Sequence, residues 1–374
     1  MKSEEILSNS SESGSVTGAS PSSSFPHHLS MKGALRKAVR CLPTENVPVW
    51  LMRQAGRYMS EYQQVRAKVS FLDLCKTPEL AAEVMITAVN KINADAAILF
   101  SDILLILEPL GFEIAFPDTG GPQILNPIKD ANDVQRVREL QSVEPLQYVM
   151  DAVKCTRENL DESKPLIGFS GAPFTLASYV IEHNASGYHK FNTVKAFMHL
   201  YPAEWDLLMT KLAVSAARYL NGQIRAGAEI IQIFDSWAGC VSQEDYRKYV
   251  FPYSKMLIDL VVPGAPVIHF APGNPMLLPL VSEAGGNVIG ADWRVSIRQA
   301  WDLAGKHRAI QGNLDPAILL TDKDTIRRHV LHILRLVERQ PGFIFNLGHG
   351  VLPQTPVENV IALIDMVHEL GRVI

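Results

Sequence analysis

The sequence predicts an α/β fold in which parallel strands alternate with helices, and two observations support this. Short, β-branched apolar runs recur along the chain, and each is followed by a polar turn and a long amphipathic stretch. Strands that alternate with helices pair in parallel through right-handed crossovers. Eight such units in a chain of 374 residues favour a single (β/α)8 TIM barrel with extra loops at the C-terminal face of the strands. The competing open doubly wound sheet lacks its G-x-G-x-x-G motif after the first strand.

The predicted strands are apolar runs bounded by turn-forming residues. In chain order they cover residues 47–52, 96–100, 166–169, 230–234, 266–270, 288–291, 309–311 and 343–346. Helical patterns separate them, and 78–92 and 357–370 are the clearest examples. The apolar residues of the second follow the spacing of one helix face: Val360, Leu363, Ile364 and Val367.

Three segments depart from the strand–helix alternation. Residues 108–127 are rich in proline and glycine, which predicts an excursion or hairpin, and residues 180–192 form a predicted polar loop. Residues 1–30 are rich in serine and poor in large apolar side chains, so we expect a disordered tail ahead of a barrel domain spanning 31–374. Acidic residues in the tail, and no arginine before Arg36, argue against a transit peptide.

Composition excludes several classes of protein. The net charge of −4 gives nucleic-acid binding no electrostatic support. The four cysteines lie far apart with no C-x-x-C pair, which argues against a zinc ribbon or a disulfide scaffold and favours a reducing, cytoplasmic location. No apolar stretch approaches the roughly 18 residues of a membrane span.

The most informative segment is MRQAGRY at residues 52–58, directly after the first predicted strand. Its two arginines, Arg53 and Arg57, flank a glycine. A guanidinium group fits a carboxylate or phosphate with two parallel hydrogen bonds, so this pair is typical of an anion clamp. Two surface arginines beside a turn are the alternative interpretation.

Further polar side chains follow the other predicted strands, where a barrel carries its active site. They are Asp102, Tyr179, Asp235, Ser236, His269, Asp292, Asn313 and His349. Each has a simpler explanation: the first carboxylates could cap helices, the tyrosine could belong to the core and the last histidine could be structural. Convergence at one barrel mouth favours a functional site. His329 and His332, on a leucine-rich helix, are expected at the surface rather than as metal ligands.

At these residues the chain resembles the uroporphyrinogen decarboxylase family of haem biosynthesis, from about residue 31 to the C-terminus. The matching motifs are PVW at 48–50, MRQAGRY at 52–58, FSDIL at 100–104, GFSGAPFT at 168–175, FDSWAG at 234–239, QGNLDP at 311–316 and NLGHG at 346–350. The resemblance implies a (β/α)8 barrel and a homodimer. It also implies decarboxylation of the four acetate arms of uroporphyrinogen III to give coproporphyrinogen III, without a metal or an organic cofactor.

The resemblance also implies roles for six residues. Arg53 and Arg57 would bind substrate carboxylates, and Arg53 would be a candidate proton donor. Asp102 would face the pyrrole N–H groups as a catalytic residue. Tyr179, Ser236 and His349 would contact substrate. The sequence departs from the family's glycine-rich pattern at residues 181–187, so we expect the contacts of that loop to differ from those in the family.

Two other functions are weighed against this one. A zinc-dependent methyltransferase on the same barrel needs converging thiolate and imidazole ligands, but Phe270 and Ala271 follow His269 where a His-x-Cys motif is expected. A non-enzymatic tetrapyrrole carrier would keep the arginines but would not need Asp102.

Overall fold

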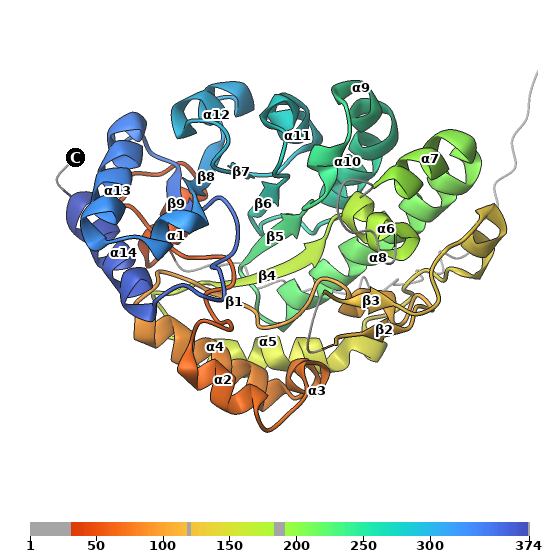
Figure 1. The fold of residues 1–374 in the computed structure, drawn as a ribbon, viewed down its shortest axis with the longest axis horizontal. Helices are drawn as coiled ribbons and strands as arrows, with labels where there is room; N and C mark the ends of the chain where they lie inside the picture. The colour runs from red at the N-terminus through yellow and green to blue at the C-terminus, as the bar shows by residue number, and fades with distance from the viewer. Residues whose placement is uncertain (1–30, 118–120, 183–190, 373–374) are drawn as a thin grey trace, which may run out of the picture.

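The computed structural model describes residues 31–117, 121–182 and 191–372, and its centre is a curled parallel sheet surrounded by helices (Figure 1). Seven strands pair in the order β1-β4-β5-β6-β7-β8-β9. They are β1 (Ala97–Ile98), β4 (Leu166–Gly171), β5 (Ile230–Phe234), β6 (Val267–Phe270), β7 (Val288–Gly290), β8 (Ala309–Leu314) and β9 (Phe343–Leu347). Each coincides with a predicted run, because strands buried on both faces carry continuous apolar stretches.

The eighth predicted strand, 47–52, is reduced to one bridge that closes the ring. Val49 pairs in parallel with Phe345 of β9. On its other side the Asp95 N–H donates to the Val49 carbonyl at 2.8 Å, and the Val49 N–H donates to the Asp95 carboxylate at 2.7 Å. At this seam the Asp95 carboxylate therefore takes the place of a main-chain carbonyl as the acceptor for the Val49 N–H. His368 of the C-terminal helix contacts the same carboxylate at 2.9 Å. The TIM-barrel prediction is confirmed, with one strand shortened.

Helices pack around the outside of the strands, as the barrel prediction requires (Figure 1). The two clearest predictions are confirmed to the residue, as α4 (Pro78–Ile92) and α14 (Val357–Leu370). The other helices are α1 (Ala34–Ala38), α2 (Ser60–Arg66), α3 (Phe71–Lys76), α5 (Gln147–Asn159), α6 (Pro173–Glu182), α7 (Asn192–Leu200), α8 (Pro202–Ala226), α9 (Gln243–Asp245), α10 (Phe251–Asp259), α11 (Leu278–Ala284), α12 (Ile297–Ala304) and α13 (Lys323–Val337).

Hydrogen bonds across the barrel interior tie strands that are far apart in the chain. The Trp50 indole donates to Gln311 at 2.9 Å, and Gln311 donates to Gln232 at 3.1 Å. All three side chains are buried. These bonds satisfy buried polar atoms that would otherwise cost free energy, except for Gln232 Nε2, which has no partner among the described residues. They also tie together strands whose ends carry the candidate site.

The insertion at 108–127 contains the predicted hairpin. β2 (Ile114–Ala115) pairs antiparallel with β3 (Gln123–Ile124). The predicted loop at 180–192 begins later than expected, since α6 continues to Glu182. Residues 183–190, with most of the family departure, and the predicted tail 1–30 lie outside the described residues.

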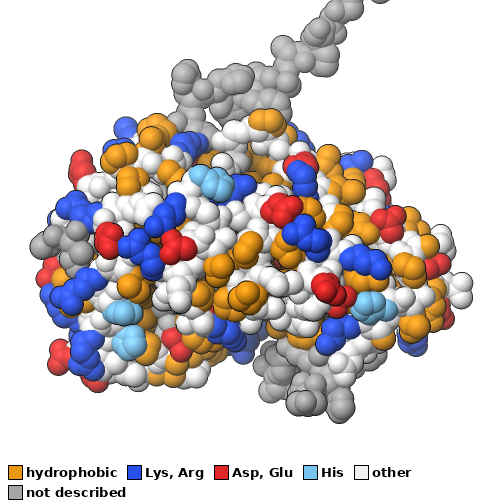
Figure 2. Space-filling view, turned by 90° about the horizontal axis from the view of Figure 1, so that it is seen from above, with side chains coloured by type: hydrophobic (Ala, Val, Ile, Leu, Met, Phe, Trp, Pro, Cys, Tyr) orange, Lys and Arg blue, Asp and Glu red, His pale blue; other side chains and the backbone are white. Residues whose placement is uncertain are grey.

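Acidic and basic side chains are interspersed on the face of the molecule in Figure 2, without a single-sign field there. Such a mixed surface agrees with the small net charge. Among the described residues, no helix is both long and apolar enough to cross a membrane.

Candidate active site at the barrel mouth

The arginine loop after the seam strand is shaped by its inward-facing residues. Gln54 is fully buried; its amide donates to the Ala96 carbonyl at 3.0 Å and accepts the Leu51 N–H at 3.2 Å. The Tyr58 hydroxyl donates back to the Gln54 carbonyl at 2.6 Å. These contacts turn Gln54 and Tyr58 toward the protein interior. Arg53 and Arg57, next to them in the chain, are both exposed.

Neither guanidinium of this pair makes a hydrogen bond or ion pair with any residue that the structure describes. Arg53 adopts a left-handed backbone with φ of 62°, which is uncommon for a residue other than glycine and is enriched at functional sites. The end of β9 and the loop after it hold Arg53 there: the Met52 N–H donates to the side chain of Asn346 in β9 at 3.2 Å, and the Val351 N–H donates to the Met52 carbonyl at 2.9 Å.

The stem of Arg53 lies directly over Gly350. A Cβ at position 350 would fall 2.5 Å from Cδ and 2.7 Å from Cγ of Arg53. Any side chain at position 350 would therefore displace the arginine. The orientation of this guanidinium depends on contacts between segments about three hundred residues apart.

Asp102 follows β1 and is half-buried. Its Oδ1 accepts the Leu104 N–H at 2.9 Å, which is a local turn bond rather than a helix cap, because the short helix Leu105–Leu107 begins after Leu104 and has no side-chain cap. No cation among the described residues forms an ion pair with it. Burial raises the pKa of Asp102 to about 6, against the opposing effects of the Leu104 N–H and the Arg53 charge. At pH 7 it is mostly an ionised carboxylate whose charge is poorly compensated.

Tyr179 projects from α6 and is half-buried. Its ring lies 5.9 Å from that of Trp237 at an angle of 57°, in the range of favourable aromatic pairs. Burial and the negative charge of Asp102 raise the pKa of Tyr179 to about 12. The phenol is therefore a neutral hydrogen-bond donor close to the carboxylate. Ser236, next to Trp237 in the β5 turn, is also half-buried.

His349 is a neutral donor rather than an acid. The Gly350 N–H donates to its Nδ1 at 2.8 Å, so the ring hydrogen resides on Nε2. Burial lowers the pKa of His349, and the positive charges of Arg53 and Arg294 lower it further. This imidazole can donate one hydrogen bond to an anion at neutral pH.

Electrostatics thus link four of the six predicted residues. The charge of Arg53 acts on Asp102, Tyr179 and His349. Arg57 and Ser236 lie beside this group in the same loops, but the structure gives them no direct contact with it. The roles of all six residues stay predictions.

Of the other strand-end candidates, His269 does not belong to the mouth. Its ring is fully buried, and Nδ1 contacts the Val281 carbonyl of α11 at 3.2 Å. It therefore faces the helix layer, and burial lowers its pKa to about 4. Asn313 is buried and donates to the carbonyls of Asp292 and Val295, at 2.8 and 2.7 Å. The expected surface position of His329 and His332 is confirmed.

Asp235 is not a helix cap but part of a buried pair beneath the site. The Thr175 hydroxyl donates to its Oδ1 at 3.0 Å and accepts the Trp237 N–H at 3.3 Å. Burial raises the pKa of Asp235 to about 7. Thr175 therefore joins α6, which carries Tyr179, to the turn that carries Ser236. The sequence singles out Asp235 but neither its partner Thr175 nor Arg294, although Arg294 also follows a predicted strand closely.

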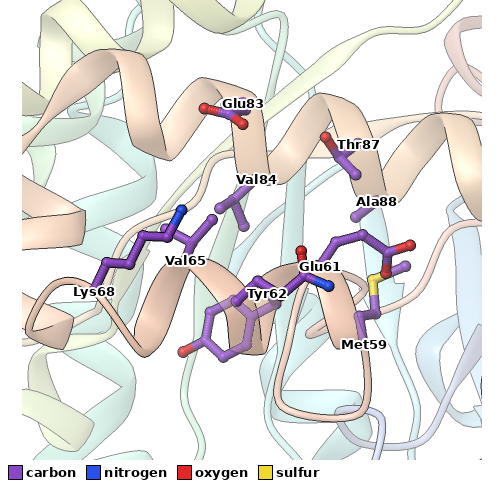
Figure 3. A pocket seen from close by; sticks show the side chains of 10 residues that line it. Met59, Glu61, Tyr62, Val65, Lys68, Glu83, Val84, Thr87 and Ala88 are labelled. Atoms are coloured by element: carbon purple, nitrogen blue, oxygen red, sulfur yellow. The ribbon is translucent and has the colours of Figure 1, made fainter.

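A separate pocket of about 220 Å³ lies between α2 and α4, with side chains of both helices around it (Figure 3). Its walls include Lys68, Glu83 and Thr87 but none of the six predicted residues. It is smaller than most small-molecule sites, and Glu61 at its edge is paired with Lys91 at 2.5 Å. Within the described ranges, no group of three or more acidic, histidine or cysteine side chains could hold a metal ion.

Comparison with known proteins assigns the chain to a family. The family described as "Uroporphyrinogen decarboxylase (URO-D)" matches residues 31–370. A protein called uroporphyrinogen decarboxylase from Carboxydothermus hydrogenoformans is 51% identical over 91% of this chain and 97% of its own length. One of the same name from Geobacter metallireducens is 47% identical over 88% and 96%.

Solved structures support the fold alone. A methyltransferase from Methanosarcina mazei covers 90% of this chain and 98% of its own, with a TM-score of 0.73 and 22% identity. A putative vitamin-B12 independent methionine synthase from Listeria monocytogenes has a TM-score of 0.54 at 9% identity. The barrel is therefore shared with proteins of other names.

Proposed function

We propose roles for the barrel-mouth residues on the premise that the chain belongs to the uroporphyrinogen decarboxylase family, as a carboxy-lyase of haem biosynthesis (EC 4.1.1.37). Its substrate is uroporphyrinogen. In the proposed reaction, the four acetate arms of isomer III become methyl groups, giving coproporphyrinogen III and four molecules of CO2. The family match over 31–370 carries this conclusion.

The pyrrole ring supplies the electron sink that other decarboxylases take from a cofactor. Protonation of a ring carbon gives a cationic ring. The carbon–carboxylate bond then breaks, its electron pair neutralises the ring, and CO2 leaves. A second proton converts the resulting methylene group to methyl, and the ring carbon then releases the first proton, which restores the aromatic pyrrole. For each arm, one proton thus replaces one CO2, and no metal or organic cofactor is needed.

Asp102 would stabilise the ring cation. A unit charge at about 4 Å is worth roughly 4 kcal/mol at an effective dielectric near 20, or about three decades in rate if the interaction forms only in the transition state. The poorly compensated charge of Asp102 supports this role, because a cationic ring next to the carboxylate would compensate that charge. Its carboxylate would accept the pyrrole N–H groups.

The remaining residues would hold the acidic arms. Arg53 and Arg57 have guanidinium groups without partners among the described residues, and each charge-assisted hydrogen bond contributes about 1.5–3 kcal/mol. Neutral His349 would donate from Nε2, and Tyr179 and Ser236 would donate from their hydroxyls. Arg53 would also be the proton donor, with Tyr179 as the competing acid.

A homodimer and a cytoplasmic location complete the proposal. Both follow from the family, and the absence of any C-x-x-C pair supports a reducing compartment. Sedimentation of the purified protein tests the first of these.

Anaerobic incubation of purified, chelator-treated protein with uroporphyrinogen III tests the function. We expect successive loss of four carboxylates, counted by chromatography of the oxidised products. Recovery of unchanged octacarboxylate, with binding intact, would favour a carrier. Turnover only after zinc and a methyl donor are added would favour a methyltransferase.

A further inference from the structure

A third arginine stands at the barrel mouth, in the turn after β7. Asp292, Trp293 and Arg294 form this turn, which packs against the loop that carries His349. A Cβ added to Gly348 would lie 2.6 Å from the Trp293 backbone nitrogen and 2.8 Å from its ring. The two loops are therefore in direct contact.

Arg294 is held rigidly on one side and open on the other. Its Nη1 donates to Asp292 Oδ2 at 2.5 Å, and its guanidinium carbon lies 4.3 Å from the centroid of the Trp293 ring. The Asp292 side chain is only 3% exposed, whereas that of Arg294 is 45% exposed. A planar guanidinium that is stacked and anchored at one nitrogen keeps its other donors for a ligand.

The Asp292 carboxylate is also held in place by two main-chain N–H groups. Its carboxylate accepts the Gly273 N–H at 2.7 Å and the Arg294 N–H at 3.0 Å. A simple surface ion pair would explain these contacts equally well. The surroundings of His349 support a role in substrate binding, because the charge of Arg294 acts on that imidazole together with the charge of Arg53. Together with the contact between Trp293 and Gly348, this effect places Arg294 beside His349 at the mouth.

We propose that Arg294 is a further substrate-binding arginine, which takes one carboxylate arm of the tetrapyrrole on the β7 side of the mouth. The inference rests on the proposed function. Three strand steps separate β7 from the seam strand that precedes Arg53, or about 14 Å at the usual spacing between strands. A macrocycle with acidic arms on every side can engage both arginines at once.

The test compares Arg294→Gln and Arg294→Lys with a matched control, Arg327→Gln. Arg327 is a similarly exposed arginine on α13 that pairs with Glu369 at 3.0 Å. We expect Arg294→Gln to raise KM for uroporphyrinogen and Kd for uroporphyrin about fivefold, with kcat within about twofold, because uniform binding is lost. Arg294→Lys should lose less, and Arg327→Gln should match the wild type.

A second measurement tests whether Arg294 lies close to His349, and it does not depend on turnover. The imidazole pKa of His349, followed by NMR, should rise in Arg294→Gln, because one neighbouring cation is gone. The thermal midpoint shows whether the variants fold, and Arg294→Lys retains the charge beside Asp292. The proposal is wrong if Kd for uroporphyrin is unchanged in folded Arg294→Gln, or if Arg327→Gln weakens binding equally. Absence of turnover in the wild type would instead reject the proposed function, while the Kd comparison would still decide the subsite.

Discussion

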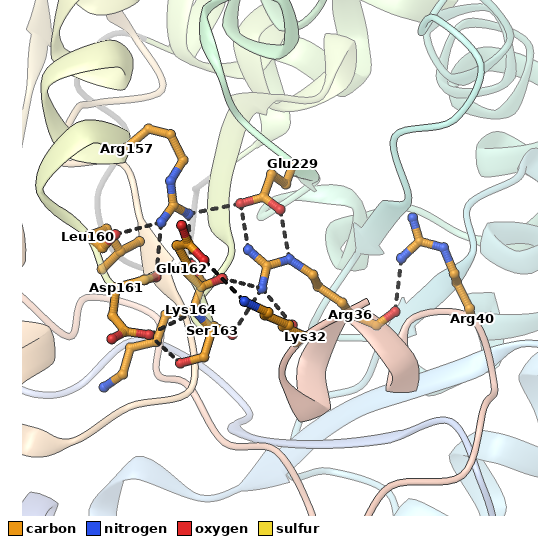
Figure 4. Close-up of polar contacts among 10 residues, drawn as sticks. All are labelled: Lys32, Arg36, Arg40, Arg157, Leu160, Asp161, Glu162, Ser163, Lys164 and Glu229. Atoms are coloured by element: carbon orange, nitrogen blue, oxygen red, sulfur yellow. Dashed lines mark hydrogen bonds and ion pairs between the residues drawn. The ribbon is translucent and has the colours of Figure 1, made fainter. Parts of the chain in front are cut away.

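The two ends of the barrel use arginine and carboxylate side chains in opposite ways. At the N-terminal end, Arg36 donates to both oxygens of Glu229 at 2.7 and 2.9 Å, and Arg157 donates to the same carboxylate at 2.8 Å (Figure 4). At the C-terminal end, Arg53 and Arg57 have no such partners among the described residues.

The lower cluster, formed by Arg36, Arg157 and Glu229, is also saturated by main-chain carbonyls. Arg36 donates to the carbonyls of Lys32, Glu162 and Ser163, and Figure 4 shows these bonds converging from separate loops. Its side chain is only 4% exposed. The comparison teaches that charge is neutralised where the barrel is stabilised, whereas Arg53, Arg57 and Asp102 are left uncompensated where we propose that an octacarboxylate binds.

Replacing Asp102 with Asn should have the largest effect on turnover. We expect kcat to fall about a thousandfold, because the stabilising charge at the ring centre is lost. Steady-state assays measure this, and the Arg294→Gln variant provides a control at the same mouth. Near-normal turnover would remove Asp102 from the mechanism.

The same variant tests how pH acts on the uncompensated carboxylate. The pKa of Asp102 is raised to about 6, so the folded state holds its proton more tightly than the unfolded state. Its contribution to stability therefore declines as pH rises from about 4 through 6. Wild-type kcat/KM should fall below about pH 6, as the free carboxylate takes a proton. Asp102→Asn should lose the decline in stability with pH.

Replacing Glu229 with Gln should damage stability and spare catalysis. The change leaves buried Arg36 and partly exposed Arg157 without their carboxylate, and breaking a buried pair costs about 3 kcal/mol. Denaturant titration measures this loss, and kcat/KM of the folded protein should match the wild type. An equal loss of kcat/KM would contradict the division of labour between the two ends.

Gly350→Ala should act through Arg53 without unfolding the barrel. The three atoms nearest to its Cβ would all belong to the flexible side chain of that arginine, so we expect about a tenfold loss of kcat/KM at unchanged thermal stability. A double-mutant cycle with Arg53→Ala is decisive, since residues that act through one another are not additive. If Gly350→Ala lowers kcat/KM as much in the Arg53→Ala background as in the wild type, Gly350 has another role.

Arg57→Lys should give the smallest of these effects. Lysine keeps the charge but loses the planar fork, so KM should rise about threefold with kcat retained. An unchanged KM would count against a clamp at Arg57, and would leave Arg53 as the better-supported half of the pair.

The sequence predicts the strands well and individual side chains less well. Continuous apolar runs identify seven of the strands, but no pattern shows that Asp95 replaces a main-chain partner of Val49 at the seam. His269 ends a strand like the site residues, yet it faces α11, because successive strand residues point to opposite sides. Arg294 required the structure, since its relation to His349 depends on contact between two loops.

The seam has a consequence for synthesis of the protein. Arg53 is translated early, but Asn346 and Gly350 form the contacts that position it. The seam also depends on His368, near the end of the chain, which contacts the Asp95 carboxylate. A nascent polypeptide that lacks these residues cannot hold the Arg53 guanidinium in its final position. Competence to bind substrate should therefore arise only after the last helix has been released, and nonsense mutations within that helix should eliminate activity even though they spare every residue that touches the ligand.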